Sequence, residues 1–202
     1  MTRKLSGQKI VIATHNKGKL EEFAELLKPH GVDAVSAGDL GIAEPEETES
    51  TFIGNARIKA LNAAQHSGLI AIADDSGLCV DALDGEPGVY TADWAGPGRD
   101  FSRAMRLVEE KLAAKGAKTP DQRRGRFICT LVVRWPDDHE KVYVGEAPGQ
   151  LVWPPRGALG HGYDPVFVPD GQTRSFAEMT HDEKNKLSHR GRALELLLHD
   201  LF

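Results

Sequence analysis

The chain has 202 residues, of which 40% are hydrophobic, so it is long enough to bury a substantial core and is not expected to be disordered. Its formal net charge of −5 argues against a partner such as polymeric nucleic acid, which normally requires a basic face, while a small anion would need only a local cluster of cations. The two cysteines, Cys79 and Cys129, lie in apolar stretches and are expected to be reduced core thiols. The first residues lack the apolar core of a signal peptide and no apolar stretch approaches a membrane span, so a cytoplasmic protein is expected.

The first part of the chain alternates strands and helices, which is typical of a parallel or mixed sheet. The expected elements are a strand at 9–13, a polar turn at 14–19, a helix to about Leu27, a strand at 32–37, an acidic loop at 38–50 and a helix at 51–66. The apolar run that begins at Leu69 is then expected as a buried strand that ends at Asp74 and Asp75.

The rest of the chain is expected to add to the same sheet. The elements are a strand at 78–83, a Gly/Pro-rich loop at 84–98, a helix at 100–115, strands at 127–135, 141–145 and 150–153, a Gly-rich loop at 157–165, a short strand at 166–168 and a helix at 189–201 capped by Ser188. The predicted fold class is therefore α/β, an elongated mixed sheet with flanking helices. Residues 1–202 form one domain, in which the meander around 125–155 makes a second lobe.

Two adjacent carboxylates, Asp74 and Asp75, follow the apolar run and precede Ser76-Gly77. Two unpaired charges cannot both be buried cheaply, so they call for a cation. At the carboxyl edge of a sheet, where open α/β folds place ligands, that cation would be magnesium carrying phosphate. The alternative is a solvated turn, because Asp, Ser and Gly are all turn formers.

Two further segments in the first part of the chain contain residues suited to binding an anion or its accompanying cation. The turn THNKGK opens a helix, whose N-terminal N–H groups favour anions, and Lys17 and Lys19 add positive charge. The pair Glu46-Glu47 could reach the same cation as the aspartates. Ordinary polar turns and a solvated acidic loop are the alternatives.

The C-terminal quarter carries cations and an aromatic residue on loops. Lys184, His189 and Arg190 gather near the start of the last helix, where they oppose the helix dipole and favour a bound anion or an oxygen-rich base. The loop GHGYDP presents Tyr163 and Asp164, and aromatic and imidazole rings can stack on bases. The alternatives are a solvated basic turn and a β-turn.

Five motifs occur in a fixed order: THNKGK, EET followed by TFIGNARIKA, IADDSG with LDGEPGVYTADWAG, GHGYDP and EKNKLSHRGRAL. From about Lys9 to the C-terminus the chain therefore resembles the inosine triphosphate pyrophosphatase family, also called the dITP/XTP or non-standard purine NTP pyrophosphatases. The resemblance implies a two-lobed α/β fold with the active site in the cleft, a homodimer, and magnesium as cofactor. It implies hydrolysis of dITP, ITP and XTP to the monophosphate and pyrophosphate.

By matching positions, the resemblance also implies roles for individual residues. Asp75 would be the general base, and Glu47 and Asp75 would bind the metal, although the register leaves Glu46 open as the ligand. The implied substrate contacts are Thr14, His15, Asn16, Lys17, Gly18 and Lys19 for the triphosphate, Lys59 as a further phosphate or catalytic lysine, and Ser76, His161, Gly162, Tyr163, Asp164, Lys184, His189 and Arg190 for phosphate, ribose and base. One departure is His161, which stands where many members have Phe and offers less apolar area for stacking on the base.

Two rival functions share some of these features. A strand that ends in two aspartates also resembles the ribose-phosphate loop of phosphoribosyltransferases, but here DDSG runs into LCVDAL rather than a Gly-rich turn. A nucleotide-binding module without catalytic activity is the second rival. The presence of Asp75, Lys19 and the acidic loop argues against it.

Overall fold

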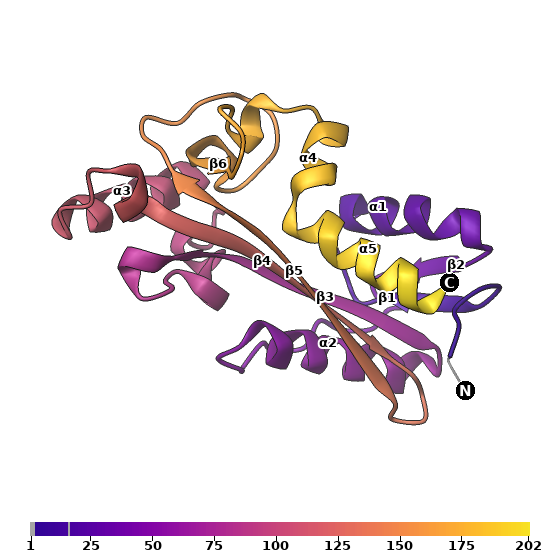
Figure 1. Cartoon of the computed structure of the whole chain (residues 1–202). Helices are drawn as coiled ribbons and strands as arrows, with labels where there is room; N and C mark the ends of the chain where they lie inside the picture. The colour runs from indigo at the N-terminus through magenta and orange to yellow at the C-terminus, as the bar shows by residue number, and fades with distance from the viewer. Residues whose placement is uncertain (1–2, 16) are drawn as a thin grey trace. The chain divides into compact units, whose positions relative to one another are not determined.

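The computed structural model describes residues 3–15 and 17–202 and contains a mixed sheet with flanking helices (Figure 1). The helices are α1 (Lys17–Leu27), α2 (Phe52–Ser67), α3 (Phe101–Ala114), α4 (His181–Leu187) and α5 (His189–Leu201). The strands are β1 (Lys9–Ile12), β2 (Asp33–Ser36), β3 (Ile70–Val80), β4 (Arg124–Arg134), β5 (Glu140–Leu151) and β6 (Phe167–Pro169). Within the described residues, six strands form one sheet in the order β2-β1-β3-β4-β5-β6. Because β1 is parallel to β2 and β3 while β6 is antiparallel to β5, the predicted α/β class with a mixed sheet is confirmed.

The chain divides into two compact units. The first consists of Met1–Asp75, Thr130–Val144 and Ala193–Phe202, and the second of Ser76–Cys129 and Gly145–Arg192. Of the residues 125–155 that sequence analysis assigned to a second lobe, 130–144 belong to the first unit and the others to the second. No helix in the described part of the chain is both long and apolar enough to cross a membrane.

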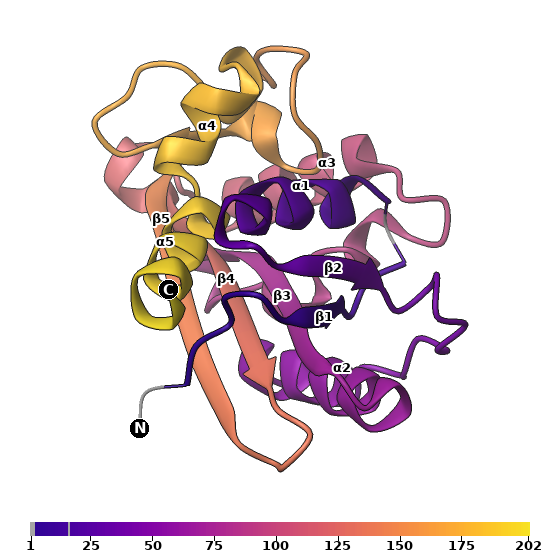
Figure 2. The same cartoon turned by 90° about the vertical axis from the view of Figure 1, so that its right-hand side faces the viewer.

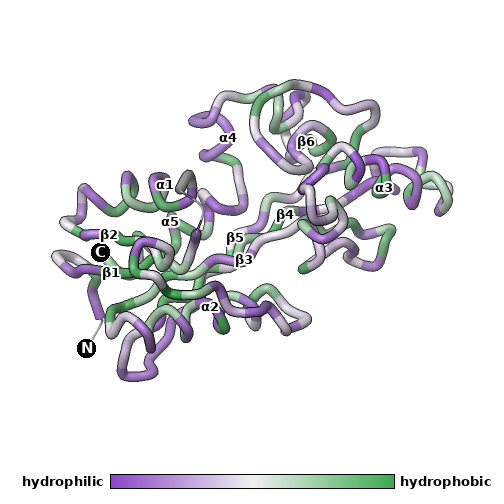
Figure 3. Tube along the Cα trace, turned by 180° about the vertical axis from the view of Figure 1, so that it is seen from behind, coloured by the Kyte–Doolittle hydropathy of each residue, from purple (hydrophilic) through white to green (hydrophobic). Residues whose placement is uncertain are grey.

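In the first unit, α1 and α2 cover opposite faces of the parallel strands (Figure 2). The α1 segment is amphipathic, with Phe23 and Leu27 buried and Glu25 exposed, and its tube alternates between purple and green (Figure 3). The helix α2 packs alanines, among them Ala56 and Ala60, against the sheet. Because these side chains are small, the α2 backbone can pack close to β3. A longer side chain on the same helix can then reach residues of β3.

The ends of α2 follow from the sequence. Thr51 is the N-cap, and its hydroxyl accepts a hydrogen bond from the N–H of Gly54 at 3.0 Å. Gly68 ends the helix in the left-handed conformation, with φ of 68°, which favours glycine at this position. These two ends fix the register of the helix.

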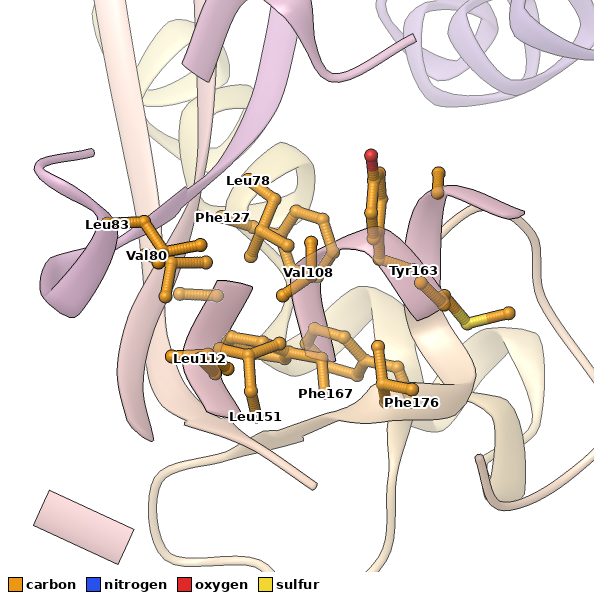
Figure 4. Packing of buried hydrophobic residues seen from close by; sticks show 14 of the residues in the cluster. Leu78, Val80, Leu83, Val108, Leu112, Phe127, Leu151, Tyr163, Phe167 and Phe176 are labelled. Atoms are coloured by element: carbon orange, nitrogen blue, oxygen red, sulfur yellow. The ribbon is translucent and has the colours of Figure 1, made fainter. Parts of the chain in front are cut away.

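The hydrophobic core of the second unit includes three phenylalanines that pack together (Figure 4). The ring of Phe127 lies edge-on to Phe167 at 4.7 Å, and Phe167 stacks on Phe176 at 5.4 Å. Helix α3 packs Val108 and Leu112 into the same cluster. The core holds the loop around residues 157–165 against the unit.

Two strand predictions are wrong. The strand β3 does not end at the aspartates but continues through Asp74, Asp75, Ser76 and Gly77 to Val80, because each carboxylate meets a lysine and its burial is compensated. The expected strands at 141–145 and 150–153 are one strand, β5. It persists through Gly149, where a Cβ would lie 2.3 Å from the carbonyl oxygen of Val168, so only glycine lets β6 approach.

The C-terminal helix is confirmed. It begins at His189, and the Ser188 hydroxyl accepts a hydrogen bond from the N–H of Gly191 at 3.0 Å, as a cap does. A short helix that was not predicted, α4, precedes it. Lys184 therefore belongs to α4 rather than to the first turn of α5.

Candidate active site

The two aspartates of the acidic pair on β3 form ion pairs with lysines from two different helices. Successive side chains of a strand point to opposite faces, and the ion pairs of Asp74 and Asp75 are with different lysines. The ammonium of Lys19, on α1, donates to both carboxylate oxygens of Asp74, at 3.0 and 2.8 Å. The Asp75 carboxylate instead lies 3.9 Å from the ammonium of Lys59, on α2. The expectation that both aspartates surround one metal ion stays a prediction.

Lys59 joins the acidic loop to β3. Its Nζ atom lies 2.7 Å from Oε1 of Glu47 and 3.9 Å from Oδ1 of Asp75, and its side chain is only 11% exposed. Burial alone lowers the pKa of this lysine, but the nearby carboxylates of Asp74, Asp75 and Glu47 outweigh burial and raise it. Of the two glutamates left open by the sequence, Glu47 is the one whose carboxylate reaches this point, and Glu46 is exposed.

Asp75 has an unusual protonation equilibrium. Burial is the main cause that raises its pKa, to about 6, and the negative charges of Glu47 and Asp74 add to it. The positive charge of Lys59 and a hydrogen bond with Asn55 act in the opposite direction. A carboxylate with this pKa is ionised at neutral pH and is still basic enough to accept a proton.

The residues around Lys59 fit a magnesium ion. Glu47 and Asp75 present carboxylate oxygens to one point, and that point already favours a positive charge, since both contact the same ammonium. Magnesium is usually held by one or two carboxylates, with water and substrate phosphates completing its shell. Among the residues that the structure describes, no group of three or more His, Cys, Asp or Glu side chains forms an all-protein metal cage. A magnesium site with two carboxylates and substrate phosphates as ligands agrees with the usual coordination of the ion. It also agrees with the lack of such a cage among the described residues.

The turn before α1 is described only in part. Thr14 is buried, and the His15 imidazole Nε2 lies 2.9 Å from the carbonyl oxygen of Ile42. Asn16 lies outside the described residues, as do the side-chain surroundings of Lys17 and Gly18 at the start of α1. Lys19, at the end of this predicted segment, directly contacts the acidic pair through Asp74.

A small pocket of the first unit lies beside this turn. Its lining includes His15, Glu44 and the stem of Lys59. The His15 ring nitrogen Nδ1 lies 4.0 Å from the Glu44 carboxylate. The loop between β2 and α2 therefore contacts the predicted phosphate turn as well as Lys59.

The second unit brings together a different set of predicted residues. The buried carboxylate of Asp164 accepts hydrogen bonds from the backbone N–H of His161, at 2.9 Å, and from the ammonium of Lys184. Gly160 is required beside it: its φ is +73°, and a Cβ would lie 2.2 Å from Oδ2 of Asp164. Asp164 thus fixes both the Gly-rich loop and the α4 lysine.

The prediction that the ring of Tyr163 stacks on a base is wrong. The residue is 1% exposed and belongs to the hydrophobic core (Figure 4). Its ring lies edge-on to that of Phe101. Its hydroxyl donates to the carbonyl oxygen of Thr91 at 2.9 Å, and burial raises its pKa. In the sequence, a tyrosine on a Gly-rich loop looks available to a ligand. In the structure, Asp164 fixes this loop and the tyrosine ring is buried in the core.

The start of α5 is anchored to the same unit. The His189 ring stacks on Phe127 with centroids 5.0 Å apart and planes 16° apart. His189 and Arg190 are both partly buried, and Ser76 is a partly buried residue of β3. The contact between His189 and Phe127, a core residue, gives the first turn of α5 a defined orientation.

Asn55 is a site residue that sequence analysis missed. It is buried, hydrogen bonds to Asp75, and accepts a hydrogen bond from the N–H of Glu49 at 2.9 Å. The signal was present, because Asn55 and Lys59 are four residues apart on one helix and therefore share a face. Asn55 ties the acidic loop to the aspartate on β3.

The architecture and this cluster of two lysines and three carboxylates define an α/β protein built to hold a charged ligand. Residues 10–200 match the model of the Ham1 family, and the chain belongs to that family. It is 58% identical over 100% of its length, and 99% of the relative, to the dITP/XTP pyrophosphatase of Ruegeria pomeroyi. It is 54% identical to the dITP/XTP pyrophosphatase of Bradyrhizobium diazoefficiens, covering 96% of this chain and 94% of the relative.

Solved structures agree with this assignment. A HAM1 protein from Coxiella burnetii superposes with a TM-score of 0.89 at 38% identity, covering 94% of this chain and 96% of that one. A nucleoside-triphosphatase / dITP/XTP pyrophosphatase from Mycobacterium abscessus superposes with a TM-score of 0.78 at 41% identity, covering 94% and 98%. The resemblance inferred from the five motifs is confirmed.

Proposed function

We propose that the protein hydrolyses non-standard purine nucleoside triphosphates, namely dITP, ITP and XTP, to the monophosphate and pyrophosphate. This activity would remove them from the nucleotide pool. The curated relatives over the full chain are dITP/XTP pyrophosphatases. The observation that carries the proposal in this chain is the cluster of Asp75, Lys59 and Glu47, which combines a carboxylate of raised pKa with a buried lysine.

In the proposed reaction Asp75 acts as the general base. It orients a water molecule and takes its proton as the water attacks the α-phosphorus, and pyrophosphate leaves. Its pKa of about 6 leaves it deprotonated at neutral pH, which is the state that the step requires. Positioning and electrostatics supply most of the rate acceleration in phosphoryl chemistry, so no covalent nucleophile is needed.

The phosphate chain is assigned to cations of the first unit. Lys19 and Lys59 would contact phosphate oxygens, together with the turn formed by residues 14–18. Magnesium is proposed as the cofactor, held by Glu47 and Asp75, and when bound it would neutralise charge on the leaving pyrophosphate. The magnesium ion and the two lysines would together balance the high negative charge of a triphosphate.

The base and ribose are assigned to the remaining residues that the sequence predicts for the site. Hypoxanthine and xanthine carry a 6-oxo acceptor where adenine has an amino donor, so a donor such as Arg190 favours the former. The proposed contacts are Ser76, His161, Gly162, Asp164, Lys184, His189 and Arg190, with Tyr163 contributing backbone rather than its buried ring. His161 is the exposed ring of the Gly-rich loop and is assigned to the face of the base.

Two broader features are also proposed. The protein acts in the cytoplasm, where the nucleotide pool is, and it forms a homodimer. Neither polymeric nucleic acid nor a membrane is proposed as a partner, in keeping with the net charge of −5.

A substrate panel with magnesium tests the proposal. ITP, dITP, XTP, ATP and GTP would be incubated with the protein, and monophosphate, pyrophosphate and free phosphate would be measured separately. IMP and pyrophosphate from ITP, at a rate far above that for ATP, would support the proposal, and IDP with single phosphate would refute it. In a separate incubation with 5-phosphoribosyl 1-pyrophosphate, pyrophosphate released only when a free base is added would instead indicate a phosphoribosyltransferase. Binding of the triphosphates without turnover would indicate a nucleotide-binding module.

A further inference from the structure

Asp74 is the member of the acidic pair to which the proposed reaction gives no role. Its side chain is 5% exposed in the interior of β3. Both of its carboxylate oxygens lie within hydrogen-bond distance of one ammonium, at 3.0 and 2.8 Å from Nζ of Lys19. A buried carboxylate that meets one lysine through both oxygens restricts where that ammonium can lie.

Lys19 needs such a restriction to act on a phosphate. It lies in the first turn of α1, where a positive charge opposes the helix dipole and gains nothing from the helix itself. Its long stem would otherwise sample many rotamers and lose that freedom when substrate binds. Because an ammonium has three N–H donors, Lys19 can contact Asp74 and a further acceptor at the same time. Its side chain is 33% exposed, whereas that of Asp74 is almost fully buried.

We propose that Asp74 is a positioning residue for the triphosphate, which acts by holding the ammonium of Lys19 in the place where it meets a phosphate oxygen. The inference rests on the proposed function, in which Lys19 contacts the triphosphate. Adjacent residues of β3 then have separate tasks on the two faces of the sheet. Asp75 works with Lys59 on the α2 side, and Asp74 orients Lys19 on the α1 side.

The competing explanation is an ion pair that only fastens α1 to β3. Such a pair would affect stability but not the affinity for phosphate. The first unit offers a matched control in Lys141 and Asp200, a lysine–aspartate pair 2.7 Å apart that links β5 to α5 and has no proposed role. Neutralising this control pair should leave KM for ITP unchanged.

A double-mutant cycle tests the proposal. Lys19→Met, Asp74→Asn and the double variant would be compared for kcat and KM with ITP and with ATP, both with magnesium. Binding of inorganic pyrophosphate with magnesium would be measured by calorimetry in the same proteins. We expect Asp74→Asn to raise KM about tenfold for both nucleotides with kcat within about threefold, and to weaken pyrophosphate binding by a similar factor. In the Lys19→Met background the same change should alter KM by less than about twofold, because Asp74 acts through Lys19.

The cycle contains its own folding control. Lys19→Met removes the ammonium that contacts both oxygens of a buried carboxylate and is expected to lower the melting temperature. The double variant replaces this pair with neutral groups and should recover the melting temperature. An unchanged or lower KM in Asp74→Asn, or effects that simply multiply in the double variant, would overturn the proposal. If the wild-type protein does not hydrolyse ITP, the proposed function is wrong. Separately, pyrophosphate binding that is unchanged in Asp74→Asn would overturn the proposed role of Asp74.

Discussion

Asp75 is a carboxylate whose burial conflicts with its charge. The surrounding negative charges of Glu47 and Asp74 make ionisation harder, and Lys59 and Asn55 make it easier. The balance leaves a pKa of about 6, which places the group close to the pH at which a general base is most useful. Such a residue lowers the stability of the folded chain in exchange for reactivity.

The variant Asp75→Asn should lose activity while it keeps its fold. The change preserves shape but removes the base and one anionic metal ligand. Loss of a general base alone costs about 10²–10⁴-fold in kcat. Release of pyrophosphate from ITP measures the rate, and circular dichroism verifies the fold. An active variant with unchanged magnesium dependence would mean that another residue is the general base. The control is Asp137→Asn, which removes an exposed carboxylate paired with Arg3.

The same variant should be more stable than the wild type at neutral pH without metal. The pKa of Asp75 rises from 3.8 in the unfolded chain to about 6 in the fold, so the folded state binds more protons between these values. The stability contributed by this group is therefore fully present below about pH 4 and is lost as pH rises through 6. Above pH 6 the charged carboxylate costs about 3 kcal/mol, and Asp75→Asn removes most of this cost.

Urea unfolding at pH 4 and pH 7.5 with a metal chelator tests this prediction. The stability gain of Asp75→Asn should be present at pH 7.5 and shrink at pH 4. The control Asp137→Asn removes a carboxylate whose pKa is lowered by its hydrogen bonds with Arg3, so it should show no gain at pH 7.5. An Asp75→Asn protein that is less stable than the wild type at pH 7.5 would contradict the raised pKa.

Arg190→Ala should change which base is accepted. If Arg190 donates to the 6-oxo group, its loss should lower kcat/KM for ITP and XTP by about one to two decades and that for ATP far less. The ratio of the ITP and ATP rates measures this directly. An equal fall for both nucleotides would make Arg190 a phosphate contact, and base recognition would then fall to His189 or the loop at 161–164.

At the scale of secondary-structure elements, two features position the functional residues. The strand β3 turns adjacent aspartates toward different helices, because its side chains alternate between faces. The helix α5 begins at His189, so the residues proposed to meet the base occupy its first turn. In both cases a side chain is useful because the element that carries it is fixed by the core.

Ser188→Ala tests the second of these features. The hydroxyl satisfies the N–H of Gly191, and removing an N-cap costs about 1 kcal/mol. Denaturant unfolding should show this loss, and KM for ITP should rise because His189 and Arg190 follow directly. Ser102→Ala, at an exposed serine in the first turn of α3, should change stability by less than about 0.5 kcal/mol. A Ser188→Ala protein of unchanged stability would mean that the cap is dispensable.

For the whole molecule, the sequence predicted the fold class, most helices and the family, because these depend on periodicity and on motifs in order. The predictions from the sequence failed for polar residues that are buried, because a polar side chain in a polar stretch is expected to be exposed. The aspartates looked like the end of a strand, since lysines from α1 and α2 that compensate them are distant in sequence. Tyr163 looked like a ligand contact, since nothing local reveals that its ring is 1% exposed. Asn55 was missed because its partners lie on a loop and on β3.

The central claim, attack of water on the α-phosphorus with release of pyrophosphate, is tested most directly by isotope labelling. ITP would be hydrolysed with magnesium in water enriched in ¹⁸O, and both products would be analysed by mass spectrometry. The account predicts that one ¹⁸O atom enters IMP and none enters pyrophosphate. Label in pyrophosphate, or formation of IDP with labelled phosphate, would contradict it, because water would then have attacked a different phosphorus atom.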